Sequence, residues 1–172
     1  MIATSMTANT RNRQGMDAPR DAVATLFIFF GLAFAPTLIG AAFPPDTWYE
    51  MLNKPAWEPP RWLFGPIWIT LYMLIGYAGY LAWSSSIGRA RQRAFLIYSA
   101  QLILNALWTP LFFGLHSPAL ALINIVAQCL VILLNIIVFY RIKPAAGLLL
   151  VPYLLWVTYA LLLNATIWSL NR

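Results

Sequence analysis

The sequence predicts an all-α membrane protein: a bundle of five transmembrane helices, with an ordered loop rich in tryptophan and proline after the first. Of 172 residues, 61% are hydrophobic and only 9% are charged, too few to cover a soluble globule. Five apolar runs lie at about 22–43, 65–84, 94–113, 119–140 and 146–168, each near the roughly 20 residues that cross a bilayer core. The runs do not alternate with period two, which argues against a membrane β-barrel.

The chain before the first run is polar. Residues 1–21 are rich in Thr and Asn and carry Arg11, Arg13 and Arg20. This composition predicts a disordered N-terminal arm, because it offers little apolar surface to bury. The membrane domain is then expected to occupy residues 22–172.

The stretch WYEMLNKPAWEPPRWLFGPIW at residues 48–68 leads from the first run into the second. It holds four tryptophans and four prolines beside charged Lys54, Glu58 and Arg61. Prolines remove backbone donors and push the preceding residue to extended geometry, which predicts an ordered, non-helical loop. Indole rings on such a loop are suited to form a lid or an aromatic wall.

The charges in the connections predict the orientation. One side of the membrane would hold eight cations and the other three, Lys54, Arg61 and Arg172. By the positive-inside rule, the N-terminus faces the cytoplasm and the tryptophan-rich loop faces away, if the membrane is a bacterial inner membrane. The net charge of +6 is thereby explained, and a nucleic-acid partner has no support. The eight cations are Arg11, Arg13, Arg20, Arg89, Arg91, Arg93, Arg141 and Lys143.

The second and third runs carry the first candidate pocket residues. Trp68 and Tyr72 are one helical turn apart, beneath the loop. Amides and aromatic rings share one face of the third run, where Pro110 predicts a bend. Amides inside a membrane are costly unless paired, so they are expected to bond a neighbouring helix or a ligand. The residues of that face are Gln101, Asn105, Trp108 and Phe112.

The fourth and fifth runs complete the candidate set. Asn124, Gln128 and Asn135 form a polar stripe, which we interpret mainly as hydrogen bonds between helices. Trp156 and Ala160 share a face of the fifth run.

The residue inventory excludes several chemistries. The chain has one His, His116, expected in a solvated loop, and one Cys, Cys129, expected as a small buried residue. No pair of carboxylates lies within an apolar run, so a metal site, a Ser–His–Asp triad and a thiol pair are not expected. The remaining inventory favours an aromatic pocket for a large, flat, apolar ligand.

These motifs resemble the translocator protein family, also called the tryptophan-rich sensory protein or peripheral benzodiazepine receptor family (TspO/MBR). The resemblance rests on the run from Trp48 to Trp83 and on an ordered set of shorter matches. These are AP at 35–36, QLILNALW at 101–108, PLFFG at 110–114, PYLLW ending at Trp156 and LN at 163–164.

The resemblance implies a five-helix bundle, usually dimeric, whose pocket under the first loop binds porphyrins, synthetic ligands and, in some members, sterol. It places the dimer contact on the third helix, near Ser99 and Ala100. No cofactor is implied as a requirement, and porphyrin, as protoporphyrin IX or haem, would be the ligand. The implied pocket residues are Trp57, Pro60, Arg61, Trp68, Tyr72, Asn105, Trp108, Trp156 and Ala160.

The chain departs from the family pattern in the fifth helix. Ala165 and Ser169 stand where the proposed sterol motif needs a tyrosine and a basic residue, so we expect weak sterol binding and a bacterial-type member. The expected function is a membrane receptor that binds porphyrins and regulates tetrapyrrole level or a stress response. Light-dependent porphyrin degradation near Trp68 and Trp156 leaves enzyme status open. The alternative function is transport of tetrapyrrole or sterol across the membrane.

Overall fold

The computed structural model describes the backbone of residues 3–172 and the side chains of residues 21–172. Five of its segments are long and apolar enough to cross a membrane, which confirms the predicted all-α membrane class. The helices are α1 (Ala3–Ala41), α2 (Thr47–Met51), α3 (Arg61–Ser84), α4 (Gly88–Thr109), the π-helix η1 (Pro110–Gly114), α5 (Pro118–Ile142), α6 (Pro144–Leu148) and α7 (Val151–Leu170).

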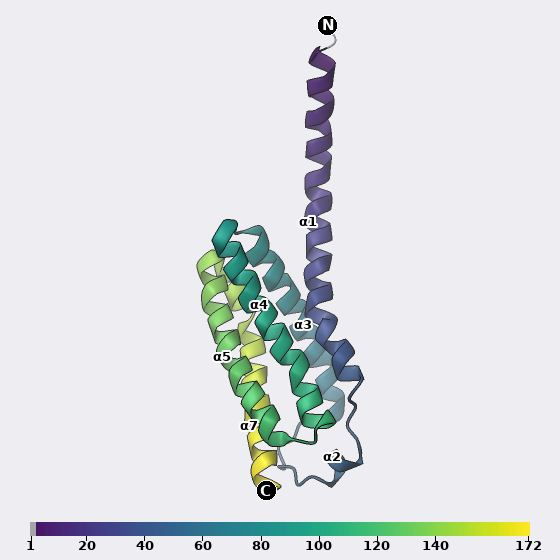
Figure 1. The fold of residues 1–172 in the computed structure, drawn as a ribbon, viewed down its shortest axis with the longest axis vertical. Helices are drawn as coiled ribbons and strands as arrows, with labels where there is room; N and C mark the ends of the chain where they lie inside the picture. The colour runs from purple at the N-terminus through teal and green to yellow at the C-terminus, as the bar shows by residue number, and fades with distance from the viewer. Residues whose placement is uncertain (1–2) are drawn as a thin grey trace.

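The long helices form one bundle (Figure 1). α1 packs against α3 and α4, whereas α5 contacts α4, α6 and α7. The connection from α1 to α3, which carries α2, lies across the same end of the bundle as η1 and the C-terminus. This arrangement brings the tryptophan-rich loop over the ends of helices that are far apart in the sequence.

The helix α1 is longer than the apolar run that predicted it. Its apolar part spans Asp21–Ala41, and its backbone continues from there back to Ala3, projecting beyond the bundle (Figure 1). Met1 and Ile2, and the side chains of residues 3–20, lie outside the described part of the chain. An isolated polar helix has only local hydrogen bonds and is marginal in water, so disorder of the arm at residues 1–21 stays a prediction.

The loop after α1 is not entirely non-helical, which corrects the sequence expectation. Thr47–Met51 form the short helix α2, and Asp46 caps it by accepting a hydrogen bond from the backbone N–H of Tyr49 at 3.2 Å. The prolines of this segment lie before and after these residues, so none removes a donor inside α2. We call residues 43–60, including α2, the lid.

At Pro110, where the sequence predicts a bend, the helix changes to the π-helix η1. Its backbone widens to the π pattern, in which the N–H of Leu115 donates to the carbonyl oxygen of Pro110 at 2.8 Å. The wider turn leaves Phe112 buried and packs Phe113 edge-on against Tyr49 of the lid, with ring centroids 5.3 Å apart. The end of the third span is therefore shaped to meet the lid.

The fifth apolar run consists of two helices rather than one. α6 ends at Leu148 and α7 begins at Val151. Pro152 has no N–H to donate to the carbonyl of Leu148, which explains the break physically.

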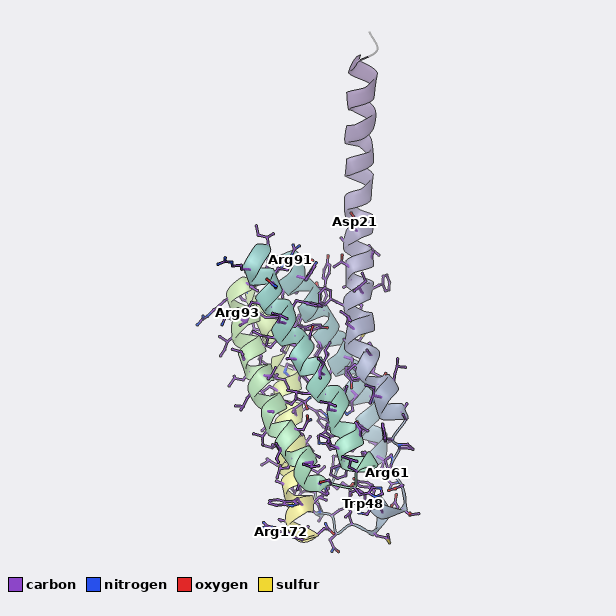
Figure 2. All side chains as sticks on the ribbon, in the orientation of Figure 1. Asp21, Trp48, Arg61, Arg91, Arg93 and Arg172 are labelled. Atoms are coloured by element: carbon purple, nitrogen blue, oxygen red, sulfur yellow. The ribbon has the colours of Figure 1, made fainter. Side chains whose placement is uncertain are left out.

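The half of the bundle away from the lid is filled by side chains. Tyr98, Ile132, Phe139 and Ala146 are at most 1% exposed, and the rings of Tyr98 and Phe139 stack with centroids 6.2 Å apart. Figure 2 shows Arg91 and Arg93 at this end with Asp21, whereas Trp48, Arg61 and Arg172 lie at the lid end.

Candidate functional site

A cavity of about 490 Å³ lies between the helices under the lid. Residues from α1, α3, α4, η1, α5, α7 and the lid line it, so every spanning segment contributes to its wall. Its volume falls in the range of about 300–1,000 Å³ that is typical of small-molecule sites. Seven of the nine residues predicted for the pocket line this cavity: Arg61, Trp68, Tyr72, Asn105, Trp108, Trp156 and Ala160.

Trp57 and Pro60 do not line the cavity. The indole of Trp57 is 47% exposed and packs edge-on against Tyr159, whose hydroxyl donates to the carbonyl oxygen of Trp57 at 2.8 Å. This contact holds the lid against the outer side of α7. Pro60 is exposed and directly precedes α3. Both residues therefore shape the lid from outside the cavity.

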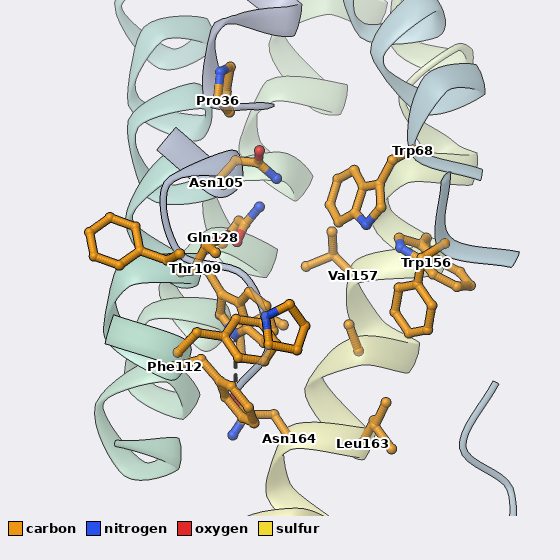
Figure 3. A pocket seen from close by; sticks show the side chains of 18 of the residues that line it. Pro36, Trp68, Asn105, Thr109, Phe112, Gln128, Trp156, Val157, Leu163 and Asn164 are labelled. Atoms are coloured by element: carbon orange, nitrogen blue, oxygen red, sulfur yellow. Dashed lines mark hydrogen bonds between the residues drawn. The ribbon is translucent and has the colours of Figure 1, made fainter. Parts of the chain in front are cut away.

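Stacked aromatic pairs build the cavity wall. The rings of Trp68 and Tyr72 stack with centroids 5.2 Å apart, and those of Trp108 and Phe112 stack at 5.0 Å. Trp68 and Trp156 lie on one side of the cavity, opposite Asn105 (Figure 3). Such rings offer broad, rigid contact area to a flat apolar ligand.

Buried amides form a hydrogen-bonded network beside these rings. The hydroxyl of Tyr72 donates to Oδ1 of Asn105 at 3.0 Å, and Nδ2 of Asn105 donates to the hydroxyl oxygen of Tyr153 at 3.2 Å. Nε2 of Gln128 donates to the same oxygen at 2.7 Å. The network ties α3, α4, α5 and α7 together, so Asn105 is held by the protein itself.

A second amide positions Trp108. Its indole Nε1 donates to Oδ1 of Asn164 at 3.2 Å, and Nδ2 of Asn164 donates to the carbonyl oxygen of Pro118 at 2.8 Å. Asn164 therefore links α4, α7 and the start of α5 at the lid end of the cavity.

Opposite charges meet at the rim of the cavity. The guanidinium of Arg61 pairs with the carboxylate of Glu50, and this bond holds the pKa of Glu50 below its usual range. The hydroxyl of Tyr49 donates to Glu58 at 2.5 Å, and the ammonium of Lys54 lies 4.1 Å from the centre of the Tyr49 ring. Burial and the nearby Glu58 raise the pKa of Tyr49, so this hydroxyl stays protonated at neutral pH.

His116 is exposed, as expected of a loop residue, but it also holds the lid. Its Nε2 lies 2.9 Å from Oδ2 of Asp46, and its ring stacks on Trp48 with centroids 4.5 Å apart. Because Asp46 also caps α2, His116 connects the lid helix to the turn between η1 and α5.

Several cavity residues were missed by the sequence analysis. Tyr49, Glu58, Gln128 and Asn164 line the cavity, although we had assigned Gln128 to contacts between helices. Gln128 was detectable as a polar residue that must face inward in a membrane. The lid residues gave no comparable signal, because their placement depends on how the loop folds back. Among the described residues, no group of three or more His, Cys, Asp or Glu side chains could hold a metal ion.

Five spanning segments, an aromatic cavity and a tryptophan-rich lid define the class: a multi-pass integral membrane protein with an internal pocket at one end. The TspO/MBR family model matches residues 23–169, and the chain belongs to this family. It is 40% identical to the "Tryptophan-rich sensory protein" of Cereibacter sphaeroides, over 86% of this chain and 92% of the relative.

Other relatives span distant organisms. The chain is 38% identical to "Protein CrtK" of Rhodobacter capsulatus, over 86% of this chain and 93% of that protein. It is 35% identical to the human "Translocator protein", over 83% of this chain and 89% of that protein.

Proposed function

We propose that this membrane protein is a receptor that binds porphyrins in the cavity under the lid and thereby regulates tetrapyrrole level or a stress response. The observation that carries the proposal is the cavity of about 490 Å³ walled by Trp68, Trp108, Trp156 and Tyr72. Indole and phenol rings provide stacking area for a tetrapyrrole. Arg61 at the rim offers a charge-assisted hydrogen bond to a porphyrin carboxylate.

Light-dependent porphyrin degradation is a further part of this proposal. A porphyrin in the cavity would lie near the oxidisable indoles of Trp68 and Trp156, which line its wall. The reaction would use light and oxygen with the bound pigment as sensitiser. Proton transfer from an acid or base of the protein would not be needed.

Binding is favoured over transport by the shape of the bundle. The cavity lies at the lid end, whereas Tyr98, Ile132, Phe139 and Ala146 fill the other half. A transporter would have to open that packed half during each cycle. Flux of protoporphyrin IX into sealed vesicles that contain the protein tests transport: we expect binding without net accumulation, and protein-dependent accumulation would establish the alternative.

Sterol is expected to bind weakly. Ser169 donates its hydroxyl to the carbonyl oxygen of Thr166 at 3.1 Å, and neither Ser169 nor Ala165 supplies the cation or the ring of the sterol motif.

Titration of the purified protein with protoporphyrin IX tests the proposed function. Tryptophan fluorescence should be quenched to saturation in darkness, and illumination should then bleach the bound porphyrin faster than free porphyrin. Saturable quenching without faster bleaching would support a receptor and exclude the degradation. No saturable quenching would overturn the proposal.

A further inference from the structure

Gln128 is a buried cavity side chain to which the proposed porphyrin binding gives no role. It lies on α5, is only 2% exposed and lines the cavity. Figure 3 shows its amide beside Asn105, on the side of the cavity opposite Trp68 and Trp156. A ligand that stacks on the indoles therefore has this amide on its far side.

Only part of the Gln128 amide is bonded to the protein. Nε2 donates one hydrogen to the hydroxyl oxygen of Tyr153 at 2.7 Å. Among the described residues, no group donates a hydrogen bond to Oε1 of Gln128. By contrast, Oδ1 and Nδ2 of Asn105 each have a partner. Gln128 thus has the larger unused hydrogen-bonding capacity.

The free part of this amide has a defined chemistry. A carboxamide nitrogen carries two hydrogens, and one of them is committed to Tyr153. The second hydrogen and the carbonyl oxygen Oε1 are unused, and we call this donor and acceptor the free edge of the amide. This edge is fixed in place, because the fully buried Tyr153 hydroxyl is also bonded to Asn105.

A ligand that fills the cavity must satisfy this edge or lose affinity. Displacing water from an amide oxygen without supplying a partner costs free energy, and the cost is larger in an apolar cavity. A closed porphyrin whose carboxylates face Arg61 at the rim presents only C–H groups at its opposite edge. It would leave Oε1 of Gln128 unpaired.

We propose that Gln128 recognises a cyclic amide (lactam) on the ligand, whose N–H and C=O groups complement the unused acceptor and donor of the Gln128 amide through hydrogen bonds. This inference rests on the proposed tetrapyrrole function and refines its substrate class. Open-chain tetrapyrroles carry lactam groups on their terminal rings, which closed porphyrins lack. The cavity is therefore built to prefer an open-chain tetrapyrrole, with Gln128 as the specificity-determining residue and Tyr153 as its positioning residue.

The test compares biliverdin, which carries two terminal lactams, with its bis-O-methyl lactim ether, which lacks their N–H groups. Dark titrations of the full-length protein should show about ten-fold tighter binding of biliverdin, the effect of leaving one buried hydrogen-bonding group unpaired. Equal affinity of the two ligands would overturn the inference. This comparison uses the unchanged protein, so it does not depend on a variant that folds.

Two variants assign the preference to Gln128. Gln128→Met keeps the length of the side chain and should abolish the preference for biliverdin. The matched control is Gln101→Met, which changes a fully buried amide on α4 that does not line the cavity, and which should keep the preference. A preference that survives in Gln128→Met would assign it to another residue and overturn the inference.

Protoporphyrin IX is titrated against the same preparations, so that the two proposals fail separately. Saturable binding of protoporphyrin IX without a lactam preference would overturn the role of Gln128 and leave the proposed function intact. Absence of binding by either class of tetrapyrrole would overturn both.

Discussion

Arg61 lines the cavity, and its guanidinium already has a carboxylate partner within the protein. Its guanidinium is paired with Glu50, so a porphyrin carboxylate must compete with this carboxylate. We expect Glu50→Gln to strengthen binding of dicarboxylic porphyrins several-fold, because the cation is released. Arg61→Ala should weaken it. Dark titrations with protoporphyrin IX and with its dimethyl ester measure both effects.

The dimethyl ester is the control for this prediction, because it keeps the ring and removes the charges. Its affinity should change little in either variant. Equal losses of affinity for the acid and the ester in Arg61→Ala would show that the substitution disturbs the lid rather than a charge contact.

We predict a role for Trp68 and Trp156 in light-driven porphyrin degradation. The double variant Trp68→Phe with Trp156→Phe should keep most of the stacking area and hence most of the dark affinity for protoporphyrin IX. It should slow light-driven product formation about ten-fold or more, because phenylalanine is harder to oxidise than tryptophan. Absorbance spectra recorded during illumination measure this rate. Conversion as fast as in the parent protein would mean that the bound pigment reacts without the indoles.

Helical spacing predicts which side chains share a face of a helix. Trp68 with Tyr72, and Trp156 with Ala160, line the cavity as their spacing indicated. Spacing does not predict hydrogen-bond partners across helices. Asn105, which was expected to bind the ligand, also bonds Tyr72 and Tyr153, and Gln128 has the freer amide.

Among the elements, α2 depends on Asp46. Burial raises the pKa of Asp46, but the Tyr49 N–H and His116 lower it more, so the pKa lies below the ordinary value. The contribution of this carboxylate to lid stability is therefore complete above the ordinary pKa of about 3.9, and is lost as the pH falls through the lower pKa of the folded protein. We expect hydrogen-exchange protection of α2 to decrease only below about pH 4.

Asp46→Asn is the matched variant for this prediction. Asparagine also caps helices well, but it does not titrate. The variant should keep α2 and show a smaller decrease in protection on acidification than the parent protein. An identical acid response of the two proteins would assign the response to another group, such as Glu50.

The contact between α5 and α6 depends on Gly147. A Cβ atom at this position would lie 2.8 Å from the carbonyl oxygen of Ile136 and 2.7 Å from Cβ of Tyr140. Gly147→Ala should therefore lower the free energy of unfolding by about 1–3 kcal/mol. Gly31 in α1 has open space around its Cβ position, so Gly31→Ala should instead be stabilising, by roughly 1 kcal/mol.

Thermal unfolding in detergent measures both glycine variants under one condition. A Gly147→Ala protein as stable as the parent would show that α6 is free to move away from α5.

Hydropathy predicted the spanning segments, but it did not predict the irregular elements. Each of the five runs corresponds to a segment that is able to span a membrane. The helix α2 was missed because prolines lie on both sides of it. Its five residues, capped by Asp46, are too few to show a helical periodicity in the sequence. The helix breaks between α6 and α7 because Pro152 lacks a backbone N–H. Hydropathy did not predict this break, since the run is apolar on both sides of it.

The bundle as a whole has a packed half and a hollow half. The packed half lies toward Arg91 and Arg93, at the opposite end from Trp48 and Arg61 (Figure 2), and the cavity lies under the lid. The positive-inside rule puts the arginine-rich end in the cytoplasm. That orientation, a bacterial membrane and a homodimer in contact through α4 stay predictions.

We propose the cavity under the lid as the porphyrin-binding site, and filling this cavity with a larger side chain tests the proposal directly. Ala160 lines the cavity, whereas Leu162, two residues further along α7, is 55% exposed on the outer surface of the bundle. Dark titration with protoporphyrin IX should show that Ala160→Trp weakens binding at least ten-fold, because the added indole occupies ligand volume. Leu162→Trp should bind like the parent protein. If Ala160→Trp bound protoporphyrin IX as tightly as the parent protein, the porphyrin would lie elsewhere, and this cavity would not be its binding site.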